Sequence, residues 1–288
     1  MTKSAPSPLS LRIVQPSVAL RPYISSYYLS EIDSTEPIND LSVPEWGSVR
    51  LIYDGGFAVD TGDDSGRFIN QPVIQGPASK AVGFTVQRCC MIGIGLLPAG
   101  YAKFWDNDVS RIADKSVPLG SIIGMAAEPL FESVVQAATA KEKFSIVDSF
   151  FLGMLRNLSS RDASDEVARV HALLNNPVIG DMEQLAEAMG RHPSALARFC
   201  KKRFGFPPKL LLRRQRFLRM LDVFQSRPYA EWPDFLDPQY TDQSHMIRDF
   251  RYFMGMSPTQ YLALPRMVQK SSALHRSQAL GGALQGLA

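Results

Sequence analysis

The chain has 288 residues, which at roughly 150 residues per domain predicts about two domains, each able to bury its own core. Its 45% apolar, 20% charged and 10% aromatic residues exclude extended disorder and fibrous repeats. Basic residues gather late in the sequence: residues 1–160 carry 13 basic and 16 acidic side chains, whereas residues 161–288 carry 18 and 12. A solvated basic face or an anionic partner of the C-terminal half would each explain this asymmetry.

Apolar runs and cysteines indicate the compartment. The longest apolar run, Cys89 to Leu97, has about nine residues, too few to cross a membrane, and the first ten residues contain no hydrophobic signal core. The three cysteines, of which only Cys89 and Cys90 are adjacent, support neither a disulfide framework nor a four-ligand zinc site. We therefore expect a cytoplasmic protein without a metal or other cofactor.

Residues 11–125 show the pattern of a β-rich domain. Short apolar runs, separated by Gly, Pro, Asp and Asn, occupy residues 48–53, 57–60, 66–69, 72–76, 81–87 and 89–97. This spacing is typical of strands and turns in a small barrel or sandwich. Several of its larger side chains form either a plain core or an apolar pocket with one charged anchor, for which we name no ligand. They are Trp46, Arg50, Tyr53, Phe84, Tyr101 and Trp105.

The residue types of this region argue against catalysis. All four histidines lie later, at positions 171, 192, 245 and 275, so a His-ligated oxygenase or a hydrolase with a His base has no support in residues 1–160. A purely carboxylate mechanism would have to use Asp54, Asp60, Asp63 and Asp64. These residues stand in the segment DGGFAVDTGDDSG, whose composition favours turns.

Helical spacing begins near Met125 and predicts two helices, over 129–140 and 144–158. The small, polar stretch NLSSRDAS, residues 157–164, is the best candidate for a domain boundary. We therefore expect a β-rich domain with C-terminal helices over 1–160 and an all-α domain over 161–265. Residues 266–288 have weak periodicity and late glycines, which predicts a flexible tail.

A helix-turn-helix pattern starts at Asp181. This residue can cap a helix with Gln184 three positions later, and Gly190 can end that helix. Pro193 suits the first turn of a second helix, and two helices joined by a glycine-containing turn form the DNA-binding helix-turn-helix unit. Residues 191–219 contain ten basic and no acidic side chains, so the basic run covers the second helix and the segment that follows.

An internal repeat supports this interpretation. Residues 194–208 align without a gap to residues 244–258, an offset of 50, with four identities: Ser194/Ser244, Arg198/Arg248, Gly205/Gly255 and Pro208/Pro258. Between the copies, KLLLRRQRFLRMLDVF predicts a long amphipathic helix. Two such units on a stiff helix can reach two successive major grooves, whose centres lie about 34 Å apart.

Both copies closely resemble the helix-turn-helix units of AraC/XylS-type transcriptional regulators. The matching segments are LAEAMGRHPSALARFCKKRFG and YTDQSHMIRDFRYFMGMSPTQYL, the second with the D-Q-S-H, R-x-F and G-x-S-P elements of the family signature. RPYISSYYLSE, VPEWGSVRLIYD, VIQGP and GLLPAGYAKFW resemble a domain that precedes this module in some regulators. The resemblance implies an α+β protein: a β-rich sensing or dimerisation domain, then an all-α domain with two helix-turn-helix units joined by a long helix.

The same resemblance implies the DNA-binding residues. Base-reading positions correspond to Ser194, Ala197 and Arg198 in the first unit and to Gln243, Ser244, Ile247 and Arg248 in the second. The two arginines can each offer a bidentate fork to guanine, and the glutamine suits adenine. Phosphate contacts are expected from Lys201, Lys202 and Arg251, and the set is completed by Arg191 and His245, the latter with an alternative as a plain surface residue.

The second unit departs from the family pattern. Phe235 stands where the family has alanine, Gln239 replaces a turn glycine, and Pro233 and Pro238 crowd the supporting helix. We therefore expect weaker docking of this unit. In the first unit Cys200 replaces a larger apolar residue, which we interpret as a small core residue.

The main hypothesis is a sequence-specific regulator that binds double-stranded DNA in the major groove and responds to a small-molecule effector. RNA polymerase is an expected partner, and a homodimer is a further expected assembly. Two alternatives remain open. In one, the N-terminal domain binds a protein partner; in the other, a β-domain enzyme carries a basic helical appendage.

Overall fold

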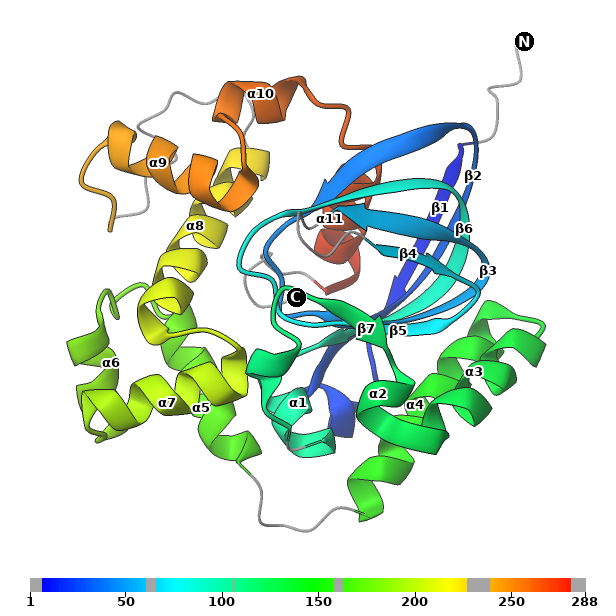
Figure 1. The fold of residues 1–288 in the computed structure, drawn as a ribbon, viewed down its shortest axis with the longest axis horizontal. Coiled ribbons are helices and arrows are strands. Elements are labelled where there is room, and N and C mark those ends of the chain that lie inside the picture. Colours follow the sequence, from blue (N-terminus) through cyan, green and yellow to red (C-terminus); the bar gives the residue numbers. More distant parts are fainter. Residues whose placement is uncertain (1–6, 61–65, 106, 158–162, 227–238, 281–288) are drawn as a thin grey trace.

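The computed structural model describes residues 7–60, 66–105, 107–157, 163–226 and 239–280 (Figure 1). Its N-terminal part is one curved antiparallel sheet with spatial order β1-β2-β6-β3-β5-β7, to which β4 is added beside β3. The strands are β1 (Leu9–Val14), β2 (Ile24–Ser42), β3 (Ser48–Asp60), β4 (Gly66–Ile69), β5 (Pro72–Gln75), β6 (Val82–Leu96) and β7 (Ser116–Pro118). The expected β-rich domain is confirmed.

Two pairs of predicted short strands are continuous in the structure. Residues 48–53 and 57–60 both belong to β3, and residues 81–87 and 89–97 fall almost wholly within β6. Strand β3 continues through Gly55 and Gly56 because β-bulges interrupt its pairing without ending it. The β3–β6 register shifts between Ile52 and Asp54 and again between Gly55 and Phe57. Gly55 has φ +69°, and a Cβ there would lie 2.2 Å from the Arg88 carbonyl oxygen, so a side chain is excluded at this bend.

One face of the sheet is covered by helices. The elements around it are η1 (Val18–Leu20), α1 (Pro98–Phe104), η2 (Val109–Arg111), α2 (Gly120–Ile123), η3 (Gly124–Ala126), α3 (Ala127–Gln136) and α4 (Ala140–Asn157). Ile24, Val49 and Ile92 from the sheet form one buried cluster with Val134 of α3 and Phe151 of α4. The two helices predicted near 129–140 and 144–158 are therefore present as α3 and α4.

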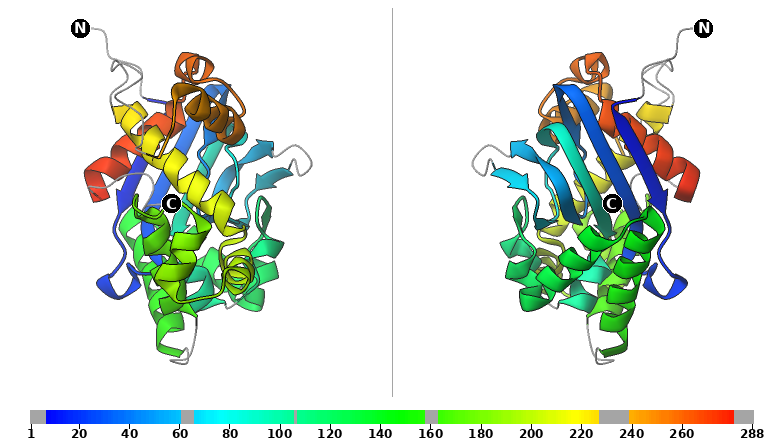
Figure 2. Two further views of the ribbon diagram at one scale, coloured as in Figure 1. Left: turned by 90° about the vertical axis from the view of Figure 1, so that its left-hand side faces the viewer. Right: turned by 90° about the vertical axis from the view of Figure 1, so that its right-hand side faces the viewer.

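The C-terminal part is helical, as expected. It consists of α5 (Ser164–Asn175), α6 (Met182–Met189), α7 (Pro193–Phe204), α8 (Pro208–Ser226), α9 (Gln243–Met254), α10 (Pro258–Ala263) and α11 (Met267–Leu280). The long α8 joins the segments that carry α7 and α9 (Figures 1 and 2). None of the helices within the described ranges is long and apolar enough to cross a membrane.

The expectation of a flexible tail over 266–288 is wrong for residues 267–280. These residues form α11, which packs on β1 and β2. Two backbone N–H groups at its start, those of Val268 and Gln269, donate to Asp40 Oδ2 at 2.7 and 3.1 Å, so β2 supplies the cap that the helix lacks in its own sequence. Residues 281–288 lie outside the described part of the chain, as do most of the boundary residues, 158–162.

The helical part shares its core with the N-terminal part. Trp46 from the loop between β2 and β3 and Ala99 of α1 lie in one buried cluster with Leu185, Leu196 and Phe204 of the helical part. Leu41 and Val43 belong to a second cluster with side chains of α8 and α9. The two parts of the chain are therefore packed together through apolar side chains, which place α7 to α9 against the sheet domain.

Candidate nucleic-acid interface

The first helix-turn-helix unit consists of α6 and α7, with the caps that the sequence predicts. Asp181 Oδ1 accepts from the Gln184 N–H at 2.9 Å, and Gly190 ends α6 in the left-handed conformation at φ +61°. Pro193 is the first residue of α7, and His192 Nδ1 caps that helix by accepting from the Ser194 N–H. These local interactions set the turn between the two helices.

The outer face of α7 carries the predicted DNA contacts. Ser194, Arg198, Lys201 and Lys202 are exposed and Ala197 is partly exposed, whereas Leu196, Cys200 and Phe204 are buried on the opposite side. Burial raises the pKa of Cys200 to about 12, which fits the expectation of a small, unreactive core residue. The exposed residues lie on one face of one helix, the arrangement that a recognition helix requires.

Arg191 has a different environment. Its guanidinium is paired with Glu166 of α5 and lies 5.0 Å from the centre of the Phe199 ring. A DNA contact by Arg191 would require these interactions to be given up. The structure thus separates Arg191 from the exposed set on α7.

The helix that the repeat pairs with α7 is α9, which has the same length and the same kind of C-terminal end. Both helices have twelve residues, begin 50 positions apart and end at a left-handed glycine, Gly205 at φ +86° and Gly255 at φ +72°. Asp242 caps α9 by accepting from the His245 N–H at 2.6 Å. The internal repeat therefore corresponds to two matching helices.

On α9 the predicted contacts are exposed with one exception. Gln243, Ser244, Arg248 and Arg251 are exposed and Ile247 is partly exposed. The exception is His245, whose Nε2 accepts from Arg216 Nη2 at 3.1 Å and whose ring lies 5.1 Å from that of Tyr240. His245 is thus part of the contact between α8 and α9, a role that the sequence pattern did not separate from DNA binding.

A buried carboxylate holds α9 on α8. Asp249 is 1% exposed and accepts from Arg213 Nε at 2.6 Å, from Arg216 Nη2 at 3.0 Å and from the Tyr240 hydroxyl at 3.1 Å. A carboxylate that is removed from water requires such partners. Sequence analysis missed this residue because its partners lie nine, 33 and 36 positions away.

The four arginines of α8 in the basic run, Arg213, Arg214, Arg216 and Arg219, make contacts within the protein. Arg213 and Arg216 bind Asp249, and Arg219 Nη2 donates to Gln239 Oε1 at 3.2 Å. Arg214 is 1% exposed, and its guanidinium lies 3.7 Å from the centre of the Trp46 ring. The run therefore has two uses: exposed cations on α7, and internal contacts on α8.

Gln239, which stands where the family has a turn glycine, does not adopt a left-handed backbone conformation. Among the described residues other than glycine, only Asn70, Asp114 and Arg266 have positive φ. The Gln239 side-chain amide donates to the carbonyl oxygens of Pro177 and Ile179, which precede α6. This side chain thus ties the second unit to the first. Phe235, Pro233 and Pro238 lie outside the described residues.

The buried Arg214 also joins α8 to the sheet domain. Its Nη1 donates to the carbonyl oxygen of Ala78 at 3.0 Å and to that of Glu45 at 3.4 Å. Burial lowers the pKa of Arg214 to about 9. His171 of α5 meets the same Trp46 ring edge-on at 5.1 Å between ring centres. Trp46 is therefore a contact point for two helices of the DNA-binding part.

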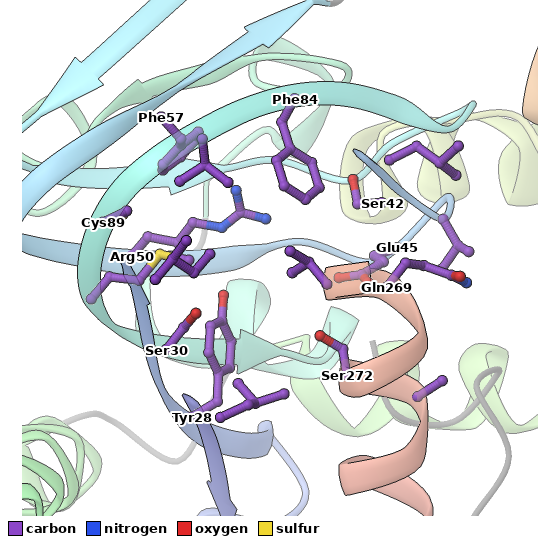
Figure 3. Close-up of a pocket in the computed structure, with 18 of the residues that line it drawn as sticks. Tyr28, Ser30, Ser42, Glu45, Arg50, Phe57, Phe84, Cys89, Gln269 and Ser272 are labelled. Carbon is purple, nitrogen blue, oxygen red and sulfur yellow. The ribbon is translucent and has the colours of Figure 1, made fainter. Parts of the chain in front are cut away.

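A cavity of about 100 Å³ lies between the sheet and α11 (Figure 3). Its walls come from β1, β2, β3, β6 and α11 and are mainly apolar. Arg50 and Phe84, two of the pocket candidates, line it. Trp46 and Tyr101 are 2% exposed and belong to the core, where the Tyr101 hydroxyl donates to the carbonyl oxygens of Trp46 and Gln75. The contribution of α11 could not be expected from a segment interpreted as a tail.

The described residues contain no group of three or more His, Cys, Asp or Glu side chains that could hold a metal ion. Of the scattered carboxylates, Asp54 is paired with Arg88 at 2.7 Å on the surface, and Asp63 and Asp64 lie outside the described residues. Cys89 and Cys90 lie side by side on β6, and burial raises the pKa of the Cys89 thiol to about 12. These contacts give no support to a catalytic constellation in the sheet domain.

Two family models match the chain. Residues 12–118 match a domain of unknown function, DUF6597, and residues 185–263 match a helix-turn-helix domain. No curated protein matches the chain. The helix-turn-helix match spans both α6–α7 and α9–α10, in agreement with the repeat seen in the structure.

Solved structures that match the chain include ToxT from Vibrio cholerae O395, at 12% identity and TM-score 0.43, with 88% of this chain and 97% of that chain covered. ToxT from the same strain bound to (E)-4-(8-methylnaphthalen-1-yl)but-3-enoic acid matches at 12% identity and TM-score 0.42, covering 89% and 98%. The AraC-like transcriptional activator CuxR matches at 13% identity and TM-score 0.27, covering 80% and 92%. The domain model agrees with the capped helices α6, α7 and α9, so residues 185–263 of this chain form a helix-turn-helix domain.

Proposed function

We propose that this regulator reads one DNA site with α7 and α9 in successive major grooves, and that a small molecule bound by the sheet domain controls it. In this proposal residues 1–160 sense the effector and residues 161–265 read DNA. The observation that carries the proposal is the set of exposed polar side chains on α7 and α9. Cations that suit base and phosphate contacts are exposed on both helices, and α9 adds the amide of Gln243.

The proposed base contacts are Ser194, Ala197 and Arg198 on α7 and Gln243, Ser244, Ile247 and Arg248 on α9. Lys201, Lys202 and Arg251 are proposed to bind phosphates, which position the helices without reading sequence. Arg191 and His245 would act indirectly, since Arg191 is paired with Glu166 and His245 accepts from Arg216. RNA polymerase and a second copy of the chain are proposed partners once the protein is on DNA.

The packing between the two parts supports effector control. Trp46 of the sheet domain contacts both Arg214 of α8 and His171 of α5, so a change near this loop reaches the helices that place α7 and α9. A ligand that binds only the folded domain also raises its stability. The cavity beneath α11 offers a site for such a ligand.

A test compares Arg198→Ala with Arg67→Ala, which removes an exposed arginine from β4 of the sheet domain. On a DNA site selected by the full-length protein, Arg198→Ala should weaken binding by about 1–3 kcal/mol and relax the preference at one base pair, because a bidentate guanine contact is lost. Arg67→Ala should leave affinity unchanged. Equal effects of the two variants, or an unaltered sequence preference in Arg198→Ala, would contradict the assignment of α7.

Arg248→Ala tests the second unit on the same DNA. The departures from the family pattern predict a smaller loss than for Arg198→Ala. An equal or larger loss would show that α9 docks as fully as α7, with Gln239 and Asp249 compensating for the missing turn glycine.

A further inference from the structure

The strand register lets the Tyr28 ring lie against Gly93, next to the cavity that Tyr28 and Arg50 line. Tyr28 of β2 and Arg50 of β3 are both paired with Gly93 of β6, so the three residues form one row across the sheet. A Cβ at Gly93 would lie 1.8 Å from the Tyr28 ring, which shows that the ring lies directly over the glycine. Because Gly93 has no side chain, the Tyr28 hydroxyl and the Arg50 guanidinium can face the same space (Figure 3).

Arg50 is a cation without an acidic partner among the described residues. Its Nε donates to Ser48 Oγ at 3.2 Å, and its guanidinium lies 5.2 Å from the centre of the Phe57 ring. The acidic side chain in the cavity wall, Glu45, is paired with Arg276 at 3.3 Å. A guanidinium among apolar walls, with its terminal nitrogens turned to a cavity, favours an anionic ligand group that can accept a bidentate hydrogen bond.

The remaining walls define the rest of the ligand. Most lining side chains are apolar, among them Ile13, Phe57, Phe84 and Met91. Gln269 of α11 is 8% exposed, and its Oε1 has no hydrogen-bond partner among the described residues, so it offers a buried acceptor to a ligand hydroxyl or a water. Hydroxyl groups of Tyr28 and Ser272 point into the same space from opposite sides (Figure 3). This distribution fits an apolar body with one acidic group.

The helix α11 connects the cavity to the second helix-turn-helix unit. Its residues Val268, Gln269, Ser272, Ala273 and Arg276 face the cavity at helical spacing. Asp40 binds the N-terminus of the helix, and Glu45 binds Arg276 two turns later. Only residues 264–266 separate α11 from α10, which belongs to the second unit. A short connection therefore joins α11 to that unit.

We infer that the cavity beneath α11 binds an amphipathic monoanion, whose acidic group pairs with Arg50 and whose apolar body contacts α11, so that occupancy alters the placement of the second helix-turn-helix unit. This inference rests on the proposed effector control and assigns its site and its ligand class. The contacts from Asp40 and Glu45 determine how firmly α11 closes over the ligand.

The test uses octanoate as a probe and 1-octanol as its neutral counterpart, with binding to the full-length protein measured by calorimetry. Octanoate should bind at least about tenfold more tightly than octanol, because a charge-assisted hydrogen bond to Arg50 is available only to the acid. Arg50→Met should remove this difference, and Arg67→Met, on β4 outside the cavity, should keep it. Ala273→Phe, which fills the cavity from α11, should abolish binding of both probes while Arg50 is retained.

Three outcomes would overturn the inference. One is no binding by octanoate or by two bulkier acids, 4-phenylbutanoate and 1-naphthoate. The second is equal affinity for octanoate and octanol. The third is unchanged octanoate binding in both Arg50→Met and Ala273→Phe.

Coupling is tested on a selected DNA site. Saturating octanoate should change the Kd for DNA at least about fivefold, and the DNA should change the octanoate Kd by the same factor. Asp40→Asn, which weakens the attachment of α11, should reduce this factor. An unchanged Kd for DNA would refute the coupling. Selective DNA binding without octanoate binding would refute this inference alone, whereas octanoate binding without selective DNA binding would refute only the proposed DNA readout.

Discussion

Acid should weaken the packing of the helical part on the sheet domain through His171. Burial, followed by the nearby Arg214 guanidinium, lowers the pKa of His171 to about 4 from an ordinary value of 6.5. The folded protein therefore favours the neutral imidazole, and between pH 6.5 and pH 4 the unfolded chain binds more protons. The contribution of His171 to the free energy of unfolding is therefore fully present above pH 6.5 and is lost as the pH falls towards 4.

The size of the effect follows from this shift. At about 1.4 kcal/mol per pKa unit, the complete loss is about 3.5 kcal/mol, of which about 2 kcal/mol falls between pH 7 and pH 5. Part of the His171 surface is open to solvent, so these figures are upper limits. Urea unfolding followed by tryptophan fluorescence, repeated at half-unit steps from pH 7 to pH 4.5, measures the loss.

His171→Gln supplies the comparison, since glutamine does not titrate and can keep a hydrogen bond to Asn175. The variant should be less stable than the wild type at pH 7, because its edge contact with Trp46 is lost, but should show a shallower decline in acid. His275→Gln, which removes a histidine of α11 instead, should follow the wild-type curve. Identical pH dependence in the wild type and His171→Gln would refute the argument.

Three further substitutions test the packing of the helical part. Asp249→Asn should destabilise the protein by about 3–5 kcal/mol in urea unfolding, because two arginines lose their buried partner. The same change at the exposed Asp165 should cost under about 1 kcal/mol. Comparable losses in the two variants would contradict the role of Asp249. Gln239→Ala should cost about 1–2 kcal/mol by removing bonds between the two units, and an unchanged midpoint would show that this tie is not needed. Tyr101→Phe should lower stability by about 1–2 kcal/mol, since two buried carbonyl oxygens lose a donor; unaltered stability would indicate that water replaces it.

Local signals explain which features could be predicted from the sequence. The caps at Asp181 and Gly190 and the proline that starts α7 act over a few positions, and the repeat marks α9, so sequence alone identifies the first helix-turn-helix unit and the helix α9. The role of Asp249 depends on Arg213 and Arg216 of α8, which lie 36 and 33 positions earlier in the chain, so it could not be deduced from the local spacing of residues.

The cavity could not be predicted from the sequence either, because residues far apart in the chain form its walls. The sequence indicates Arg50 as a charged anchor, but the space around it depends on the pairing of Tyr28 and Arg50 with Gly93. The helix α11 has a weak polar–apolar pattern and is held by Asp40, more than 200 positions earlier, so its sequence resembles that of a tail.

The most direct test of the central claim is selection of bound fragments from random DNA by the full-length protein. The account predicts a discrete motif with two contact blocks about one helical turn apart, the first block altered in Arg198→Ala and the second in Arg248→Ala. A motif with one block would contradict simultaneous docking of α7 and α9. Binding that depends steeply on salt but shows no sequence preference, with and without octanoate, would contradict base reading by either helix.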